Sequence, residues 1–292
     1  MIKTIFRFIL SVILYAVVFI LANAILPFSQ GFRELGAASG NPTDFLFMLI
    51  SSSWICFTIF FIIRNANYTG IKLFTNIAFI MFFIQCFMTQ IETLFFSDAF
   101  PILTKIDIVM IVLAGLFPLL AVIPLMIKLF QNKTTVAVEI KLNIKTFLPK
   151  LVIIGIIYLF VYMIFGYFVA WQFEELRIFY TGSSEKLGFF GQLVNNYITN
   201  PIIYPFQIIR GILFVVFIIP LIYIVNKNER TFIFSICSVY LCTAIVLIIP
   251  NILFPDIVRI AHLIEMLTSM LLFGIIVGKI IWIETAKAKN SA

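Results

Sequence analysis

Long apolar segments separated by short polar links recur along the whole chain. Each segment runs for about 20 residues or more, which is the length that an α-helix needs to cross the hydrocarbon core of a bilayer. The pattern therefore predicts eight membrane-spanning helices, near residues 5–26, 44–64, 73–97, 103–128, 149–172, 200–225, 230–252 and 257–282.

The links between these segments leave no room for a soluble domain. The longest cover residues 27–43, 129–148 and 173–199, and each is too short to enclose a hydrophobic core of its own. We therefore expect one all-α transmembrane domain over residues 1–292, built as a polytopic helical bundle.

The composition agrees with lipid as the main solvent. Hydrophobic residues make up 63% of the chain and charged residues 11%, whereas an ordinary soluble domain has about 45–50% and about 25%. A soluble fold could not cover so much apolar surface. We therefore expect an integral membrane protein whose main partner is the lipid bilayer.

The basic residues indicate an orientation and argue against a nucleic-acid partner. The net charge is +7, but Lys and Arg lie in short links and never form a dense stripe with interleaved aromatic residues. Basic flanks resist translocation, so the side that carries most of them should be the cytoplasm, and that side holds both termini. It carries 14 of the 20 basic residues, namely Lys3, Arg7, Arg64, Lys72, Lys128, Lys133, Lys141, Lys145, Lys150, Lys227, Arg230, Lys279, Lys287 and Lys289.

The first span leaves an alternative open. It follows Lys3 and Arg7 and ends in Ala22-Asn23-Ala24, which matches an A-x-A cleavage signature of a secretory signal peptide. Cleavage after Ala24 would leave seven spans. The apolar stretch is longer than a usual signal peptide core and can cross the bilayer by itself, so we expect it to remain as a helix.

Small residues inside the spans are interpreted as packing residues. The cysteines show no CxxC spacing, so neither a disulfide framework nor a zinc knuckle is indicated, and we expect no metal or other cofactor. Gly274 and Gly278 form a small-xxx-small pair that predicts a close helix contact. The four cysteines are Cys56, Cys86, Cys237 and Cys242.

The acidic residues are distributed asymmetrically across the predicted membrane. Cytoplasmic links hold only Glu139, Glu229 and Glu284, and the other ten of the 13 acidic residues belong to outer loops or the outer half of the spans. The preference of Lys and Arg for the cytoplasmic side does not explain why ionisable groups enter the hydrocarbon. A shared polar site near the outer face would explain it.

The last predicted span carries a polar stripe. Arg259, His262, Glu265 and Ser269 fall within about 120° of one helical face. At about 1.5 Å per residue, Glu265 lies on the order of 13 Å below Asp256, close to the middle of the hydrocarbon. An ionisable side chain at that depth normally faces protein or water.

Two further spans carry polar residues at helical spacing. In the third span, Gln85, Thr89 and Glu92 share one face, and in the sixth, Gln207 and Arg210 are three residues apart. Arg210 is about nine residues inside the outer boundary, which is too deep for its side chain to reach the surface without strain. It should therefore pair with a carboxylate, and the candidates are Glu92 and Glu265.

The segment after the fifth span mixes aromatic and charged residues from Trp171 to Gly182. Such a mixture is typical of an interfacial aromatic belt. It is equally compatible with the rim or lid of an outer pocket, with Arg177 or Glu174 reaching inward. Both interpretations stay open.

Two short segments resemble parts of uncharacterised bacterial polytopic inner-membrane proteins. They are Gly-Tyr-Phe-Val-Ala-Trp-Gln at residues 166–172 and Arg-Ile-Ala-His-Leu-Ile-Glu at residues 259–265. The two segments together cover 14 of the 292 residues. It implies a location in the bacterial cytoplasmic membrane and implies no activity.

The favoured functional hypothesis is an intramembrane charged site, open to the outer face, that binds or transports a small solute or a lipid headgroup. In this hypothesis the arginines act as charge partners, and the glutamates and the histidine carry protons. An oligomer is compatible with the sequence. The predicted ligand-binding residues are Glu92, Arg210, Arg259, His262, Glu265, Gln85, Gln207 and Arg177.

Two other functional hypotheses remain. The first is an intramembrane enzyme acting on a lipid or lipid-linked substrate, with His262 as acid or base beside a glutamate or Ser269. The single histidine excludes bis-histidine haem, and no G-x-S-x-G or H-E-x-x-H motif is present, so no catalytic residue is assigned. The second is a non-catalytic scaffold or assembly subunit whose buried charges form a structural ion-pair network.

Overall fold

A computed structural model describes residues 2–39, 41, 43–131, 144–225 and 227–290, and the side chains of these residues except 37–39 and 285–290. This part of the chain is helical, without a β-strand. Its elements are α1 (Ile2–Ile25), α2 (Gln30–Ser39), α3 (Asp44–Asn65), α4 (Gly70–Met81), the π-helix η1 (Phe82–Phe87), α5 (Met88–Phe95), η2 (Ser97–Ala99), α6 (Lys105–Phe130), α7 (Ile144–Phe168), η3 (Ala170–Gln172), α8 (Glu174–Thr181), α9 (Phe189–Thr199), α10 (Ile203–Ile224), α11 (Glu229–Ile245), η4 (Val246–Ile248) and α12 (Asp256–Asn290).

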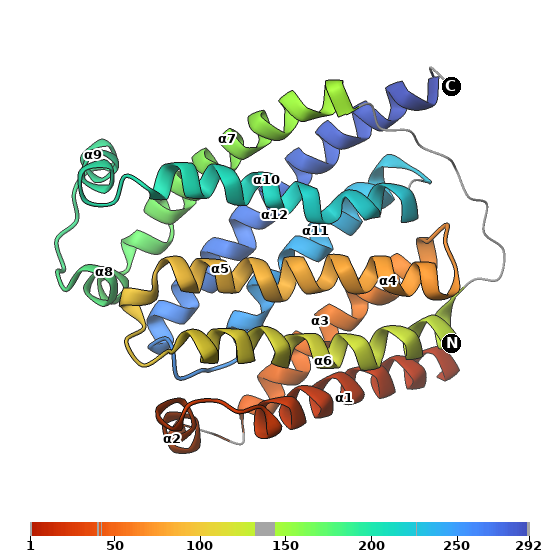
Figure 1. Cartoon of the computed structure of the whole chain (residues 1–292), viewed down its shortest axis with the longest axis horizontal. Coiled ribbons are helices and arrows are strands. Elements are labelled where there is room, and N and C mark those ends of the chain that lie inside the picture. Colours follow the sequence, from red (N-terminus) through yellow and green to blue (C-terminus); the bar gives the residue numbers. More distant parts are fainter. Residues whose placement is uncertain (1, 40, 42, 132–143, 226, 291–292) are drawn as a thin grey trace.

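Eight helical segments within these ranges are long and apolar enough to cross a membrane. They lie side by side as one bundle (Figure 1). Each segment is helical because a helix satisfies its own backbone hydrogen bonds in lipid, and the short links keep successive helices close together. Each overlaps one predicted span, and the segment Gly70–Phe95 joins α4, η1 and α5 into a single crossing. The predicted all-α bundle is therefore confirmed.

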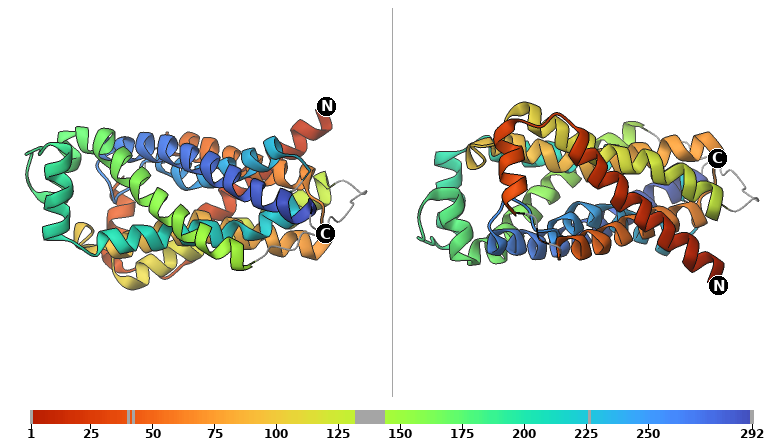
Figure 2. Two further views of the ribbon diagram at one scale, coloured as in Figure 1. Left: turned by 90° about the horizontal axis from the view of Figure 1, so that it is seen from above. Right: turned by 90° about the horizontal axis from the view of Figure 1, so that it is seen from below.

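The two ends of the bundle differ. α1 begins and α12 ends at the same end, and α2, α8 and α9 lie at the opposite end, which we call the distal end (Figure 1). α2 and α9 run across the bundle axis (Figure 2). The distribution of Lys and Arg predicts that the distal end faces the outside.

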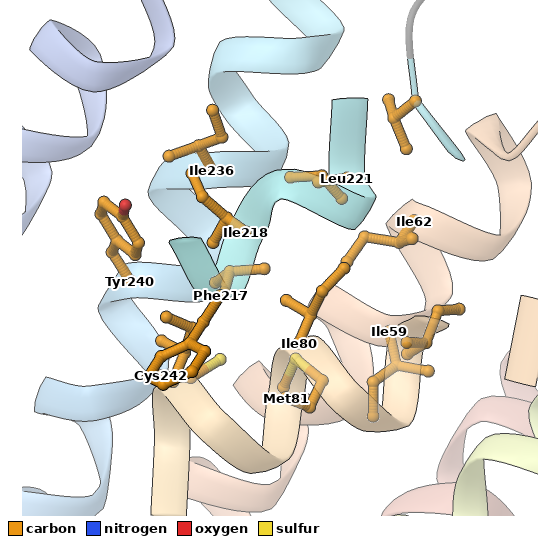
Figure 3. Close-up of a cluster of buried hydrophobic side chains, with 14 of the residues drawn as sticks. Ile59, Ile62, Ile80, Met81, Phe217, Ile218, Leu221, Ile236, Tyr240 and Cys242 are labelled. Atoms are coloured by element: carbon orange, nitrogen blue, oxygen red, sulfur yellow. The ribbon is translucent and has the colours of Figure 1, made fainter. Parts of the chain in front are cut away.

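The interior of the bundle is a continuous apolar core. Ile59 of α3, Ile80 of α4, Ile218 of α10 and Tyr240 of α11 are fully buried and belong to one cluster (Figure 3). The four cysteines are free and buried, which confirms their interpretation as packing residues. Helices that are far apart in the sequence therefore pack against one another in this core.

Glycines allow two pairs of helices to approach closely. A Cβ atom added at Gly274 or Gly278 of α12 would meet the α11 residues Cys237 or Ile233 at about 3 Å, which confirms the predicted helix contact. Gly211 of α10 packs against α7 in the same way, because an added Cβ would lie 2.9 Å from the Cα of Gly155. These contacts position α7, α10 and α12, whose distal halves carry the polar residues considered next.

The last helix extends beyond its apolar segment. It continues to Asn290, whereas its membrane-spanning part, Asp256–Glu284, agrees with the span predicted near residues 257–282. Glu284, at the end of this segment, is 7% exposed and forms an ion pair with Lys150 of α7. This ion pair satisfies a charged side chain at the end of the apolar stretch.

Candidate functional site

A cavity of about 510 Å³ opens among the helices at the distal end. Its walls come from α5, α7, α10, α12 and the segment after α11, and α8 and α9 contribute side chains from the distal side. Four strongly ionisable side chains line it, namely Glu92, Arg210, His262 and Glu265. Aromatic rings supply much of the remaining wall, namely Phe96, Phe100, Tyr158, Tyr162, Tyr167, Trp171, Tyr180, Phe189 and Phe254.

Arg210 of α10 forms a bidentate ion pair with Glu92 of α5. Both distances, Nη1 to Oε1 and Nη2 to Oε2, are 2.7 Å. Nη1 also donates to Oε1 of Gln207 at 2.9 Å. The side chain of Arg210 is 3% exposed and that of Glu92 is 26% exposed. The predicted carboxylate partner is therefore confirmed, and Glu92 fills this role instead of Glu265.

His262 lies between two partners in a hydrogen-bonded chain. Its Nδ1 is 3.1 Å from Oε2 of Glu265, one turn later on α12, and its Nε2 is 3.0 Å from the hydroxyl of Tyr180 on α8. A neutral imidazole with its proton on Nδ1 fits both contacts, because it donates to the carboxylate and accepts from the phenol. This arrangement fixes the ring orientation from both sides.

Tyr180 keeps its phenolic proton within these hydrogen bonds. Burial raises the pKa of its phenol above the ordinary value of about 10, and the carboxylates of Glu92 and Glu265 raise this pKa further. A protonated phenol can donate to Nε2 of the neutral imidazole. If the imidazole takes up a proton, the phenol oxygen can accept from it instead.

The structure separates Arg259 from this set. Its Nη1 donates to the backbone carbonyls of Leu247 and Ile248 at 2.8 and 2.9 Å, and its Nη2 pairs with Asp256 at 2.8 Å. Arg259 is 7% exposed and does not line the cavity. Its contacts hold the turn between α11 and α12.

Arg177 is also turned away from the cavity. It is 7% exposed and donates to the backbone carbonyls of Trp171, Gln172 and Ser184 at 2.8–3.2 Å. Glu174 is exposed and does not line the cavity either. The segment does contribute to the cavity wall, but it does so through Trp171, Leu176, Tyr180 and Thr181, with Arg177 holding its fold.

Gln85 and Gln207 are buried outside the cavity lining. Gln207 contacts Arg210, whereas Gln85 donates to the hydroxyl of Tyr15 on α1 at 2.8 Å. A regular α-helix would place Gln85 and Glu92 on one face. The π-helical turn at Phe82–Phe87 changes their angular relation, so that Glu92 reaches the cavity and Gln85 reaches α1.

Several cavity residues were not among those predicted. Tyr180 completes the chain on His262, and the amides of Gln192, Asn196 and Asn200 line the wall near α9. Tyr180 gives no sequence signal, because an aromatic residue near a membrane boundary is common. The spacing of Gln192 and Asn196 opposite apolar residues marks one polar face of a short amphipathic helix, and this signal was available in the sequence.

The same side chains do not form a metal centre. Within the ranges that the structure describes, no group of three or more His, Cys, Asp or Glu side chains could hold a metal ion. Glu92 is held by Arg210, and His262 bonds Glu265 and Tyr180. The arrangement can instead hold a polar ligand and exchange a proton through the imidazole.

Comparisons with protein family models, with curated proteins and with solved structures find no match to this chain. Its function is therefore argued from the cavity and from the chemistry of the side chains that line it.

Proposed function

We propose that this protein binds a small polar solute or a lipid headgroup in the distal cavity and serves as a membrane transporter or binding protein for it. The observation that carries the proposal is that both the Glu92–Arg210 pair and the His262–Glu265 pair line the same cavity. We further propose that the cavity opens to the outside of a bacterial cytoplasmic membrane.

The cost of these charges supports a binding role. An ionisable group within a membrane bundle is expensive, and such groups usually mark a substrate or ion pathway. A purely structural ion pair does not require an adjoining cavity. Here the pairs border a cavity of about 510 Å³, within the range of about 300–1,000 Å³ that is usual for ligand sites.

The hydrogen-bonded chain supports coupling of ligand binding to a proton. An imidazole can take up or release a proton, and that of His262 has a carboxylate on one nitrogen and a phenol on the other. A ligand that contacts Glu265 would alter the balance of charge around His262. Binding and proton uptake would then depend on each other.

Labelling of a cysteine in the cavity tests the first requirement, which is access from outside. Ser269 lines the cavity one turn beyond Glu265, so Ser269→Cys in a variant without the native cysteines provides the reporter. We expect membrane-impermeant methanethiosulfonates to label it in intact cells. A reintroduced Cys56, which is 0% exposed in the core, is the matched control and should stay unlabelled.

A thermal-shift screen of the purified protein tests binding itself. The probes are small amines, sugars, amino acids and carboxylates at increasing concentration. We expect at least one class to raise the melting temperature saturably in the wild type and not in Ser269→Trp, which fills the cavity. No labelling of Ser269→Cys, together with no stabilisation by any probe, would refute the proposal.

A second candidate function is an intramembrane enzyme acting on a lipid-linked substrate. The oriented imidazole of His262 favours it, because a carboxylate and a phenol hold the ring as an acid–base group is commonly held. The enzyme hypothesis predicts that His262→Gln abolishes turnover of a lipid-linked substrate and leaves binding of the substrate intact. Loss of binding without any turnover in the wild type would favour the transporter.

A further inference from the structure

We infer that the ligand carries a positive charge, as an amine or a quaternary ammonium group, and that Glu265 is its counter-ion. This inference rests on the proposed function, because it specifies the chemistry of the ligand for the same cavity. It follows from the balance of charges in the lining, from an unused carboxylate oxygen and from the aromatic wall.

The cavity lining offers no free positive charge. Arg210 contributes the guanidinium, and both of its terminal nitrogens are bound to the two carboxylate oxygens of Glu92. The remaining ionisable groups of the lining are His262 and Glu265. With both carboxylates ionised, the lining is negative when the imidazole is neutral and has no net charge when it is protonated.

An anionic ligand therefore finds no positive charge without a carboxylate partner. The Nε of Arg210 has no hydrogen-bond partner, but this atom is buried. A phosphate or carboxylate group would have to displace Glu92 from a bidentate pair whose arginine is 3% exposed. That exchange would leave Glu92 without its counter-ion and add the negative charge of the ligand to a lining that has no net positive charge. A cation meets no such obstacle.

Glu265 has one carboxylate oxygen to spare. Oε2 bonds to His262, whereas Oε1 has no hydrogen-bond partner among the described residues. Glu265 lines the cavity and its side chain is only 10% exposed. A carboxylate oxygen without a partner, on a side chain that lines a cavity, is a natural acceptor for an ammonium group.

Aromatic rings surround His262, the hydrogen-bond partner of this carboxylate. The ring of His262 lies 5.7 Å from that of Tyr180 and 5.6 Å from that of Phe254, and Tyr180 lies 6.1 Å from Phe96. Aromatic faces attract a cation through their quadrupole, and quaternary ammonium ligands are commonly bound this way. The carboxylate and the rings together favour an organic cation over a neutral polar ligand.

The relative rates of charged thiol reagents at Ser269→Cys test the inference. The cationic trimethylammonium-ethyl and the anionic sulfonato-ethyl methanethiosulfonate are compared, each normalised to its rate with a free thiol in solution. We expect the cationic reagent to react roughly tenfold faster, as Coulomb attraction over several ångströms in a partly desolvated site predicts. Glu265→Gln should abolish this preference and Glu265→Asp should preserve it.

The outcomes separate the inference from the proposed function. Equal rates, or a faster anionic reagent, would refute the cationic ligand and leave an accessible cavity. No reaction with either reagent would refute the accessible cavity itself. Elution as a folded monodisperse species is required of each variant, and Glu265→Asp provides the charge-retaining control if Glu265→Gln fails to fold.

Protection of the same cysteine identifies the source of the cation. Choline is compared with 3,3-dimethylbutan-1-ol, which has the same shape without the charge, and nanodiscs with phosphatidylethanolamine are compared with nanodiscs of phosphatidylglycerol alone. If choline alone slows the labelling, the ligand is a soluble amine. If phosphatidylethanolamine alone slows it, the ligand is a lipid headgroup. Protection by the neutral alcohol as strong as that by choline would contradict the inference.

We also infer that α9 lies in the membrane interface with its apolar face on lipid. Phe190, Val194, Tyr197 and Ile198 form one face and are 58–78% exposed, although they are large and apolar. The opposite face, with Gln192 and Asn196, lines the cavity. α9 runs across the bundle immediately before the transmembrane helix α10 (Figure 2). A helix with this pattern beside a transmembrane segment fits the headgroup region.

An environment-sensitive fluorophore tests the position of α9. It is attached to Val194→Cys and, as the matched control, to Thr199→Cys, which is exposed on a different side of the same helix. In proteoliposomes we expect blue-shifted emission and quenching by nitroxide-labelled lipids at position 194 and much weaker effects at 199. Equal, water-like emission at both positions would contradict the inference.

Discussion

Arg210 and Glu92 are 118 residues apart in the chain, yet two hydrogen bonds of 2.7 Å join them beside the cavity. The pair is unequal, because the side chain of Arg210 is 3% exposed and that of Glu92 is 26% exposed. Glu92 can therefore retain some contact with water when it loses its partner, whereas Arg210 cannot.

This inequality predicts an asymmetric response to mutation. Glu92→Gln leaves a buried guanidinium without its counter-ion and should lower the free energy of unfolding by about 2–4 kcal/mol. Arg210→Gln should cost less, and the double variant should recover part of the loss. Thermal unfolding in detergent measures all three variants. Equal effects of the single variants, adding fully in the double variant, would contradict the pairing.

Replacing Arg259 should affect stability without affecting ligand charge selectivity. Arg259→Leu removes donors to the carbonyls of Leu247 and Ile248, so it should destabilise the protein by about 2 kcal/mol or more. Because Arg259 does not line the cavity, the rate ratio of the cationic and anionic reagents at Ser269→Cys should stay unchanged. A changed ratio of rates would indicate that Arg259 contributes to the binding site.

The contribution of Tyr180 to stability should depend on alkaline pH. The pKa of its phenol is raised in the folded protein above the ordinary value of about 10, so the folded state favours the protonated form. The stability difference between wild type and Tyr180→Phe should be constant from about pH 8 to 9 and should shrink as pH rises above about 10. Chemical unfolding of both proteins across this range measures it, and a difference that grows with pH would contradict the sign.

The close contact between α7 and α10 should not tolerate a larger residue. Gly211→Ala places a Cβ 2.9 Å from the Cα of Gly155, and we expect a loss of about 1–3 kcal/mol from overpacking. Gly31→Ala is the control, because nothing lies within 4 Å of its added Cβ. Equal melting temperatures of the two variants would show that α7 and α10 are not in close contact.

Local patterns in the chain were sufficient for the architecture. Apolar runs of bilayer length predict eight crossings because a helix in lipid must satisfy its own backbone, and this requirement does not depend on any neighbour. The same local reasoning predicts that Arg210 needs a carboxylate and that Gly274 and Gly278 mark a helix contact, and both expectations hold. Depth in the membrane and spacing along one helix are properties of a short stretch of sequence.

The choice of partner was decided only by the tertiary structure. The sequence names both Glu92 and Glu265 as candidate partners for Arg210, but the arrangement of the helices pairs Arg210 with Glu92 and leaves Glu265 to His262. Arg259 lies on the same helical face as His262, yet backbone carbonyls of the preceding turn satisfy it outside the cavity. Which carbonyl, carboxylate or ring meets a side chain depends on the rotation and spacing of helices far apart in sequence. No pattern within one helix contains that information.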